Sequence, residues 1–198
     1  MTERGTSEVH RHSAGRLVRR VVTGHDAGGK AVFASDEQVE PVTLGLMPGS
    51  EFHRLWGGDQ APTFPDDGAP PAQPTYFPPV GGFRFGMFTI PGAAAGHEAP
   101  QVDDIAAAMA EIDEKLPGMM RYMEPDDPGM HTTDTIDFEV ILSGSCVLEL
   151  DDGASVTLHA GDTVVQNGTR HAWRNNGTET ARLAVFICGA HHDRVVRP

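Results

Sequence analysis

The chain has little of several residue types, and each shortage excludes a class of protein. Only two of the 198 residues are cysteines, Cys146 and Cys188, and both fall within apolar, strand-like runs. They fit small core residues better than a disulfide framework, so we expect a reducing compartment. No apolar run is long enough to cross a bilayer, and the first residues contain no apolar signal segment. We therefore expect a soluble, cytoplasmic protein.

Basic residues are also scarce. The chain has 15 lysines and arginines against 28 aspartates and glutamates, which gives a formal net charge of -13 at pH 7. Such a charge repels phosphate backbones and anionic membranes unless a basic stripe interrupts it. Arg16, Arg19 and Arg20 are better explained as a solvated strand edge. We expect no nucleic-acid partner and no membrane partner, and the lack of a helix-turn-helix pattern disfavours a DNA-binding regulator.

Motifs of two common kinds of active site are missing as well. No serine lies in a G-x-S-x-G elbow, and neither cysteine has an exposed, electropositive context. The sequence therefore does not support nucleophilic catalysis. Gly28 and Gly29 follow a strand-like run but open no helix, which indicates a turn and not a phosphate-binding loop.

What the chain does contain is a series of short strand-like segments separated by turns. β-Branched runs at 17–22 and 31–34 flank a glycine-containing turn, which predicts a hairpin, and a third run covers 40–47. From residue 137 to 188, turn residues recur at near-regular spacing, which favours an antiparallel sandwich or barrel. The run at 181–188 is apolar on both faces apart from Arg182, as in a strand buried between two layers.

Two segments interrupt this pattern. Residues 57–82 contain so many prolines and glycines that we predict a long surface loop, after which 83–90 resumes a strand. Residues 103–116 predict the one convincing helix, with Asp103 or Asp104 as its N-cap. Its apolar stripe comprises Ile105, Met109, Ile112 and Leu116. This stripe fits core packing better than a cofactor box, and a lid over the barrel mouth stays open as an alternative.

The length fits one domain of ordinary size. Residues 1–15 are polar and unpatterned, which predicts a mobile tail. We expect residues 16–198 to form the single domain.

Two segments about thirty residues apart, 131–144 and 161–175, set metal-binding side-chain types beside hairpin patterns. Strand alternation in the first places Asp137 and Glu139 on one face. Two acidic groups on a face that otherwise turns inward cost free energy unless something pairs with them, and a divalent cation commonly does so near a histidine. His171 follows a tight turn and can face the same cavity. The opposite, apolar face carries Phe138, Val140 and Leu142.

Together the two segments resemble the paired motifs of the cupin superfamily. Its metal-binding members carry G-x5-H-x-H-x(3,4)-E-x6-G followed by G-x5-P-x-G-x2-H-x3-N. The matching positions in this chain are His131, Asp137, Gly144, Gly161, His171 and Asn175. The chain departs from the pattern in several places: Thr133 replaces the second histidine, aspartate replaces glutamate, Asn167 replaces the proline, the run from Gly161 to His171 is one residue short, and no glycine lies six residues before His131.

The resemblance covers residues 131–175, and the strand pattern extends it to 188. It implies an all-β fold, an antiparallel β-barrel of the jelly-roll type, here with one added helix and a long Pro/Gly-rich loop. It also implies that His131, Asp137 and His171 hold a divalent first-row metal ion, iron, manganese, nickel or zinc, with open coordination positions. Barrels of this kind often pair by sheet packing, so the resemblance also implies a homodimer. The alternative, two hydrogen-bonded barrel histidines and a lost metal site, stays open.

Five further residues are candidates near this site. Glu139 could be a catalytic general acid or base one step deeper than Asp137, or it could lie at a solvated sheet end. Thr133 is a poor metal ligand that would hydrogen-bond a bound water. Gln166 and Trp173 could line the pocket, and Asp134 is a reserve carboxylate.

These features favour a metal-dependent cupin enzyme that acts on a small organic substrate by oxygenation, isomerisation or decarboxylation. The alternative function is a metal-free cupin module that binds a small molecule without catalysis.

Overall fold

The computed structural model describes residues 16–93 and 104–193. The predicted tail, residues 1–15, lies outside these ranges, and so does Asp103. No helix within the described ranges is long and apolar enough to span a membrane.

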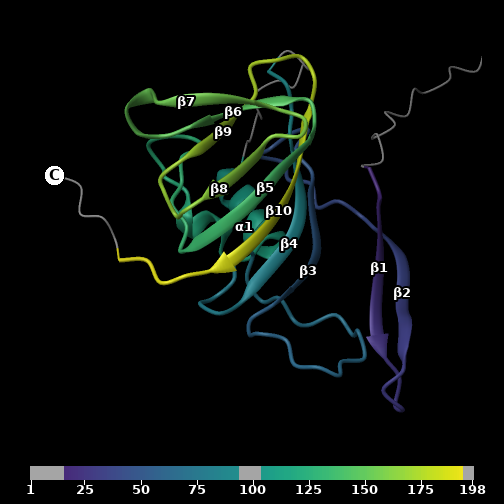
Figure 1. Ribbon diagram of the computed structural model, residues 1–198. Coiled ribbons are helices and arrows are strands. Elements are labelled where there is room, and N and C mark those ends of the chain that lie inside the picture. The colour runs from purple at the N-terminus through teal and green to yellow at the C-terminus, as the bar shows by residue number, and fades with distance from the viewer. Residues whose placement is uncertain (1–15, 94–103, 194–198) are drawn as a thin grey trace, which may run out of the picture.

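Two antiparallel sheets form the body of the protein and confirm the predicted all-β, jelly-roll class (Figure 1). The larger sheet has the order β3-β4-β10-β5-β8, and the smaller has the order β7-β6-β9. The strands of the larger sheet are β3 (Phe52–Gly58), β4 (Phe83–Ile90), β5 (Thr135–Ser143), β8 (Thr163–Gln166) and β10 (Ala181–Gly189). Those of the smaller sheet are β6 (Ser145–Glu149), β7 (Ser155–His159) and β9 (Ala172–Arg174). A short 3-10 turn, η2 (Asp151–Gly153), joins β6 to β7.

The core has two parts. One lies between the sheets and contains Ile141, Cys146, Leu148, Leu158, Ala181 and Leu183. The other joins the larger sheet to the helical segment and contains Phe52, Val185 and Ile187 from strands together with Ile112, Leu116 and Met119. Both cysteines are free, in agreement with the prediction that neither forms a disulfide.

The predicted N-terminal hairpin is present as a separate two-stranded sheet, β1 (Val18–His25) and β2 (Ala31–Val39). Figure 1 shows it standing beside the body of the protein. Its attachment is polar: the Arg20 guanidinium donates to the Leu55 carbonyl at 2.6 Å and lies 5.5 Å from the Trp56 ring centroid. The backbone N–H of His25 donates to the Asp66 carbonyl at 2.7 Å.

The predicted strand at 40–47 is wrong. Only Val42 bridges to Phe52, and the strand that the sequence did not predict, β3, follows it. Pro41 has no N–H to donate to a ladder, and Gly45 weakens a strand interior. The segment instead lays Leu44, which is 4% exposed, into the core.

The predicted helix is confirmed as α1 (Ile105–Lys115), followed by the 3-10 helix η1 (Met119–Tyr122). The Asp104 side chain caps α1 by accepting from the Ala107 N–H at 2.9 Å. The predicted stripe is only half correct: Ile112 and Leu116 are buried, but Ile105 is 67% exposed and Met109 is 37% exposed. The helix therefore docks by its C-terminal half only, and none of its residues lines the cavity described below.

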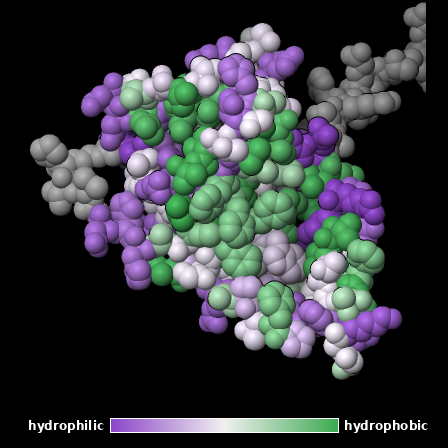
Figure 2. All heavy atoms as spheres, in the orientation of Figure 1, coloured by the Kyte–Doolittle hydropathy of each residue, from purple (hydrophilic) through white to green (hydrophobic). Residues whose placement is uncertain are grey.

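The outer face of the larger sheet is apolar, as predicted for Phe138, Val140 and Leu142, all of which are exposed. In the strand register, Phe186 of β10 lies opposite both Phe85 and Phe138. Figure 2 shows the hydrophobic area that results at the centre of this side of the molecule. Because Phe186 is 40% exposed, the prediction that the last strand is buried on both faces is wrong at this position.

Gly144, at the turn between β5 and β6, offers a direct test of the fold. Its φ is +72°, and an added Cβ would lie 2.7 Å from the Thr180 carbonyl oxygen. We expect Gly144→Ala to lower the free energy of unfolding by about 2–4 kcal/mol, from left-handed strain and overpacking together. Gly153→Ala is the matched control, because Gly153 has the same φ with nothing within 4 Å of the added Cβ. Equal losses for the two variants in urea denaturation would contradict the packing argument.

Candidate functional site

A cavity of about 170 Å³ lies within the body of the protein. Residues of β3, β4, β5, β9, β10 and η1 line it, together with loop residues that precede α1 or follow η1. Its apolar lining includes Phe52, Phe77, Phe88, Trp173, Val185 and Ile187. Four lining side chains carry a carboxyl or an imidazole group, and these are His131, Asp137, Glu139 and His171. The sequence-predicted residues His131, Asp137, Glu139, His171 and Trp173 thus share one cavity.

The two carboxyl groups enter the cavity from β5. Alternate residues of this strand point inward, and Asp137 and Glu139 are only 5% and 3% exposed. This confirms the predicted face of the strand and excludes a solvated sheet end for Glu139. Asp137 Oδ1 and Glu139 Oε2 are buried and have no hydrogen-bond partner among the residues that the structure describes.

Burial shifts the protonation of both carboxyl groups. It raises the pKa of Asp137 to about 6, against a smaller lowering by the Thr135 hydroxyl. Burial and, to a smaller extent, the negative charge of Asp137 raise the pKa of Glu139 to about 8. At neutral pH Glu139 therefore holds its proton for most of the time, and the pair carries about one negative charge.

His131 and His171 lie side by side because their backbones pair. The His131 N–H donates to the His171 carbonyl at 2.9 Å, and the reverse bond is 3.0 Å long. The two ring centroids are 4.1 Å apart. Burial, followed by the neighbouring His131, lowers the pKa of His171 to about 3, and burial also lowers the pKa of His131. Both rings are therefore neutral at pH 7.

A backbone carbonyl fixes the tautomer of each ring. Nδ1 of His131 lies 3.0 Å from the Gly129 carbonyl oxygen, and Nδ1 of His171 lies 2.9 Å from that of Thr169. A carbonyl can only accept, so each Nδ1 carries the hydrogen. The unprotonated nitrogen of each neutral ring is then Nε2, which is an acceptor or a metal ligand.

The predicted metal site is not assembled as a ligand set. Across residues 16–93 and 104–193, no group of three or more histidine, cysteine, aspartate or glutamate side chains is placed to hold a metal ion. As they are placed, His131, Asp137 and His171 therefore do not fit a shared metal, although the imidazole pair has the fixed tautomers that metal ligands require. The metal ion stays a prediction.

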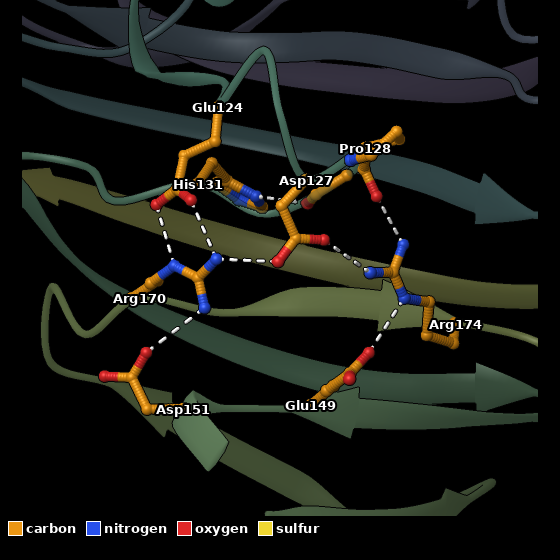
Figure 3. Close-up of polar contacts among 9 residues, drawn as sticks. Glu124, Asp127, Pro128, His131, Glu149, Asp151, Arg170 and Arg174 are labelled. Carbon is orange, nitrogen blue, oxygen red and sulfur yellow. Dashed lines mark hydrogen bonds and ion pairs between the residues drawn. The ribbon is translucent and has the colours of Figure 1, made fainter. Parts of the chain in front are cut away.

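The loop that carries His131 is held by a network of ion pairs that the sequence analysis did not identify (Figure 3). Arg170 donates to Glu124 at 2.7 and 2.8 Å and to Asp127 at 2.7 Å. Arg174 donates to Glu149 at 2.9 Å and to the Pro128 carbonyl at 2.6 Å. The two arginines flank His171 in the sequence, so the network ties the loop before one histidine to the strand of the other.

Three predicted residues lie outside the cavity lining that the described residues form. Thr133 is buried and accepts a hydrogen bond from the Thr135 hydroxyl at 2.7 Å. Asp134 lies 3.9 Å from His192 Nδ1. Gln166 is opposite Asp137 in the strand register, and its Oε1 accepts from the Thr169 hydroxyl at 2.9 Å.

Two cavity residues come from the segment predicted as a surface loop. Tyr76 and Phe77 line the cavity, their rings lie 4.9 Å apart, and Phe77 is 9% exposed. The prediction is therefore wrong for this end of 57–82. The available signal was a pair of adjacent aromatic residues in an otherwise polar, proline-rich segment.

Comparisons with known proteins agree with this architecture. Residues 118–188 match the family model of the cupin domain. The chain is 45% identical over 58 residues to phomopsin biosynthesis cluster protein C' of Diaporthe leptostromiformis, which covers 29% of this chain and 31% of that protein. It is 35% identical over 77 residues to oryzines biosynthesis cluster protein J of Aspergillus oryzae, covering 36% of this chain and 43% of that protein. The matched parts thus span less than half of these relatives.

Among solved structures, the cupin domain of Schizosaccharomyces pombe Cnp3 is similar. It is 10% identical to this chain, with a TM-score of 0.43, and the alignment covers 86% of this chain and 87% of that one.

Proposed function

We propose that this chain, whose residues 118–188 match the cupin domain, is a member of the cupin superfamily that binds a small organic molecule in the cavity and transfers a proton to or from it. The observation that supports this function is the pair of buried, unpartnered carboxyl oxygens on Asp137 and Glu139 in an otherwise largely apolar cavity. An unsatisfied buried acceptor costs about 1–3 kcal/mol. A ligand with a polar group at this end would offset that cost, while its apolar part would contact the aromatic walls.

Glu139 is the proposed acid–base group. Its pKa of about 8 lies near neutrality, where a carboxyl group can both give and take a proton. Asp137, with the lower pKa of about 6, is the more readily ionised partner. Pairs of titratable groups with separated pKa values are typical of acid–base sites. The names of the fungal relatives, which assign them to biosynthesis clusters, support an organic substrate.

A metal-dependent enzyme is the second candidate, and the tautomers of the two histidines favour it. His131 and His171 would supply Nε2 ligands, and the bound metal would act as a Lewis acid. Asp137 would have to move to complete the site, because no three such groups are placed to hold a metal in the described part of the chain.

Ligand-induced thermal stabilisation in the presence of a chelator separates the two candidates. We expect at least one of three one-ring probes, benzyl alcohol, benzylamine or phenylacetate, to raise the melting temperature, and the rise to persist in EDTA. A probe at one hundred times its Kd adds about 2.7 kcal/mol to the free energy of unfolding.

Val185→Phe should abolish this shift. Val185 lines the cavity and is 6% exposed, so the larger phenylalanine side chain would fill the space that a one-ring ligand needs. Val156→Phe, at an exposed position 51% accessible to solvent, is the control. A shift that disappears in EDTA and returns with added zinc or manganese would support the metal-dependent enzyme instead. No shift with any probe would refute the cavity as a binding site.

A further inference from the structure

We infer that the ligand of this cavity is a small organic cation, an ammonium group on an apolar body about the size of one ring. The inference rests on the proposed function, since it names the chemical class that the same cavity would bind. Two observations support the inference: the cavity is rich in hydrogen-bond acceptors, and the described residues place no three groups to hold a metal ion.

The ionisable groups in the cavity present acceptors. Asp137 and Glu139 each have one buried oxygen without a partner among the described residues, and an ionised carboxyl group only accepts hydrogen bonds. Glu139 is mostly protonated at neutral pH in the ligand-free protein, and a bound cation would favour its ionised, accepting form. His131 and His171 use Nδ1–H on backbone carbonyls, which leaves Nε2 as an acceptor. The hydroxyl of Tyr76 can either donate or accept, so it does not oppose this pattern.

Within residues 16–93 and 104–193, no lysine or arginine side chain pairs with these acceptors in the cavity. The described residues that line the cavity include no lysine and no arginine. Burial of an ionised carboxyl group without a counter-charge is unfavourable, and evolution usually pairs it with a cation or a metal. The missing positive charge is therefore expected to come from the ligand.

The spacing of the acceptors favours an ammonium group over a metal ion. A first-row metal needs donor atoms at about 2.0–2.2 Å, so that all of its ligands crowd around one point. An ammonium N–H donates to a carboxylate at about 2.7–2.9 Å, and the several N–H groups of one ammonium can satisfy acceptors on different sides. The described residues place no three groups for a metal, yet all four side chains line one cavity.

The rest of the cavity suits an apolar body. Phe52, Phe88 and Trp173 contribute aromatic surface, which also attracts a cation through the ring faces. The volume of about 170 Å³ is close to that of an apolar cavity of about 150 Å³ that takes up benzene. Benzylamine, which is protonated at neutral pH, has the required ring and ammonium group.

The test compares benzylamine with benzyl alcohol by isothermal titration calorimetry at pH 7.5 in EDTA. The two probes have the same shape and differ in charge. We expect benzylamine to bind at least about tenfold more tightly, because charge-assisted hydrogen bonds from its ammonium group are roughly twice as strong as neutral ones. Asp137→Asn and Glu139→Gln should each reduce the affinity for benzylamine about tenfold and leave that for benzyl alcohol unchanged.

Asp152→Asn is the matched control, since Asp152 is exposed in η2 and the substitution removes the same charge far from the cavity lining. If a cavity variant does not fold, the comparison of the two probes on the native chain decides alone. Equal or tighter binding of benzyl alcohol would overturn the cationic ligand and leave the proposed function standing. If neither probe binds, while zinc alone binds stoichiometrically without EDTA, both this inference and the metal-free function are wrong.

Discussion

Glu139→Gln is expected to make the ligand-free protein more stable than the native chain at pH 8.5 and to remove most of its loss of stability in alkali. Burial raises the pKa of Glu139 in the folded protein to about 8, while an unfolded glutamate has a pKa near 4.5. Between these values the unfolded chain has released its proton and the folded chain has not. The folded state binds more protons, so the free energy of unfolding falls as pH rises through this window and levels off above pH 8.

The size of this effect is about 3–5 kcal/mol, from about 1.4 kcal/mol for each unit of pKa shift. Glutamine has the same shape and does not ionise. In the variant, residue 139 should therefore contribute almost no change to the free energy of unfolding between pH 5 and 8.5. Urea denaturation of the native chain and of the variant at pH 5.5, 7 and 8.5 measures it. A variant that loses as much stability in alkali as the native chain would show that Glu139 is already paired or solvated.

His171→Asn is expected to have the opposite pH dependence and to protect the protein in acid. Burial lowers the pKa of His171 in the folded protein to about 3, against an ordinary value near 6.5. As the pH falls below 6.5 the unfolded chain takes up a proton on this residue and the folded chain does not. The contribution of the neutral ring to the free energy of unfolding is therefore at its maximum above pH 6.5. It falls by about 3–5 kcal/mol as the pH is lowered to 3.

Asparagine can keep the N–H that His171 donates to the Thr169 carbonyl but cannot take up a proton in this range. The variant should therefore be somewhat less stable than the native chain at pH 7, because the aromatic packing is lost, and should lose less between pH 6.5 and 4. His159→Asn is the control, since the side chain of His159 is 71% exposed. If the native chain and the His171→Asn variant lost the same free energy of unfolding between pH 6.5 and 4, the result would contradict a buried, neutral His171 ring.

Strand alternation made part of the site predictable from the sequence. The two-residue period of β5 is a property of the extended backbone, so placing Asp137 and Glu139 on the inner face needed no tertiary information. The pairing of His131 with His171 followed from the resemblance to a known pair of motifs. Convergence on one metal ion was not predictable, because it depends on the exact placement of side chains, which residue spacing does not encode.

Contacts between distant segments set the remaining features. The path of the proline-rich loop brings Tyr76 and Phe77 into the cavity, and nothing local to that loop determines its path. The half-docked helix has a regular apolar stripe, yet the sequence does not say that Ile105 remains outside. The arginines Arg170 and Arg174 have partners up to 46 residues away, which no local pattern predicts.

Among the described strands, β1 and β2 pair with each other and with no other strand, and a two-stranded sheet alone is marginally stable in water. Its polar attachments to Leu55 and Asp66 can break while the rest of the molecule stays folded. We therefore expect the amide hydrogens of the hairpin to exchange with solvent through a local opening, at a free energy below that of global unfolding. We expect weak protection from hydrogen exchange in the hairpin and strong protection in the strands around the cavity.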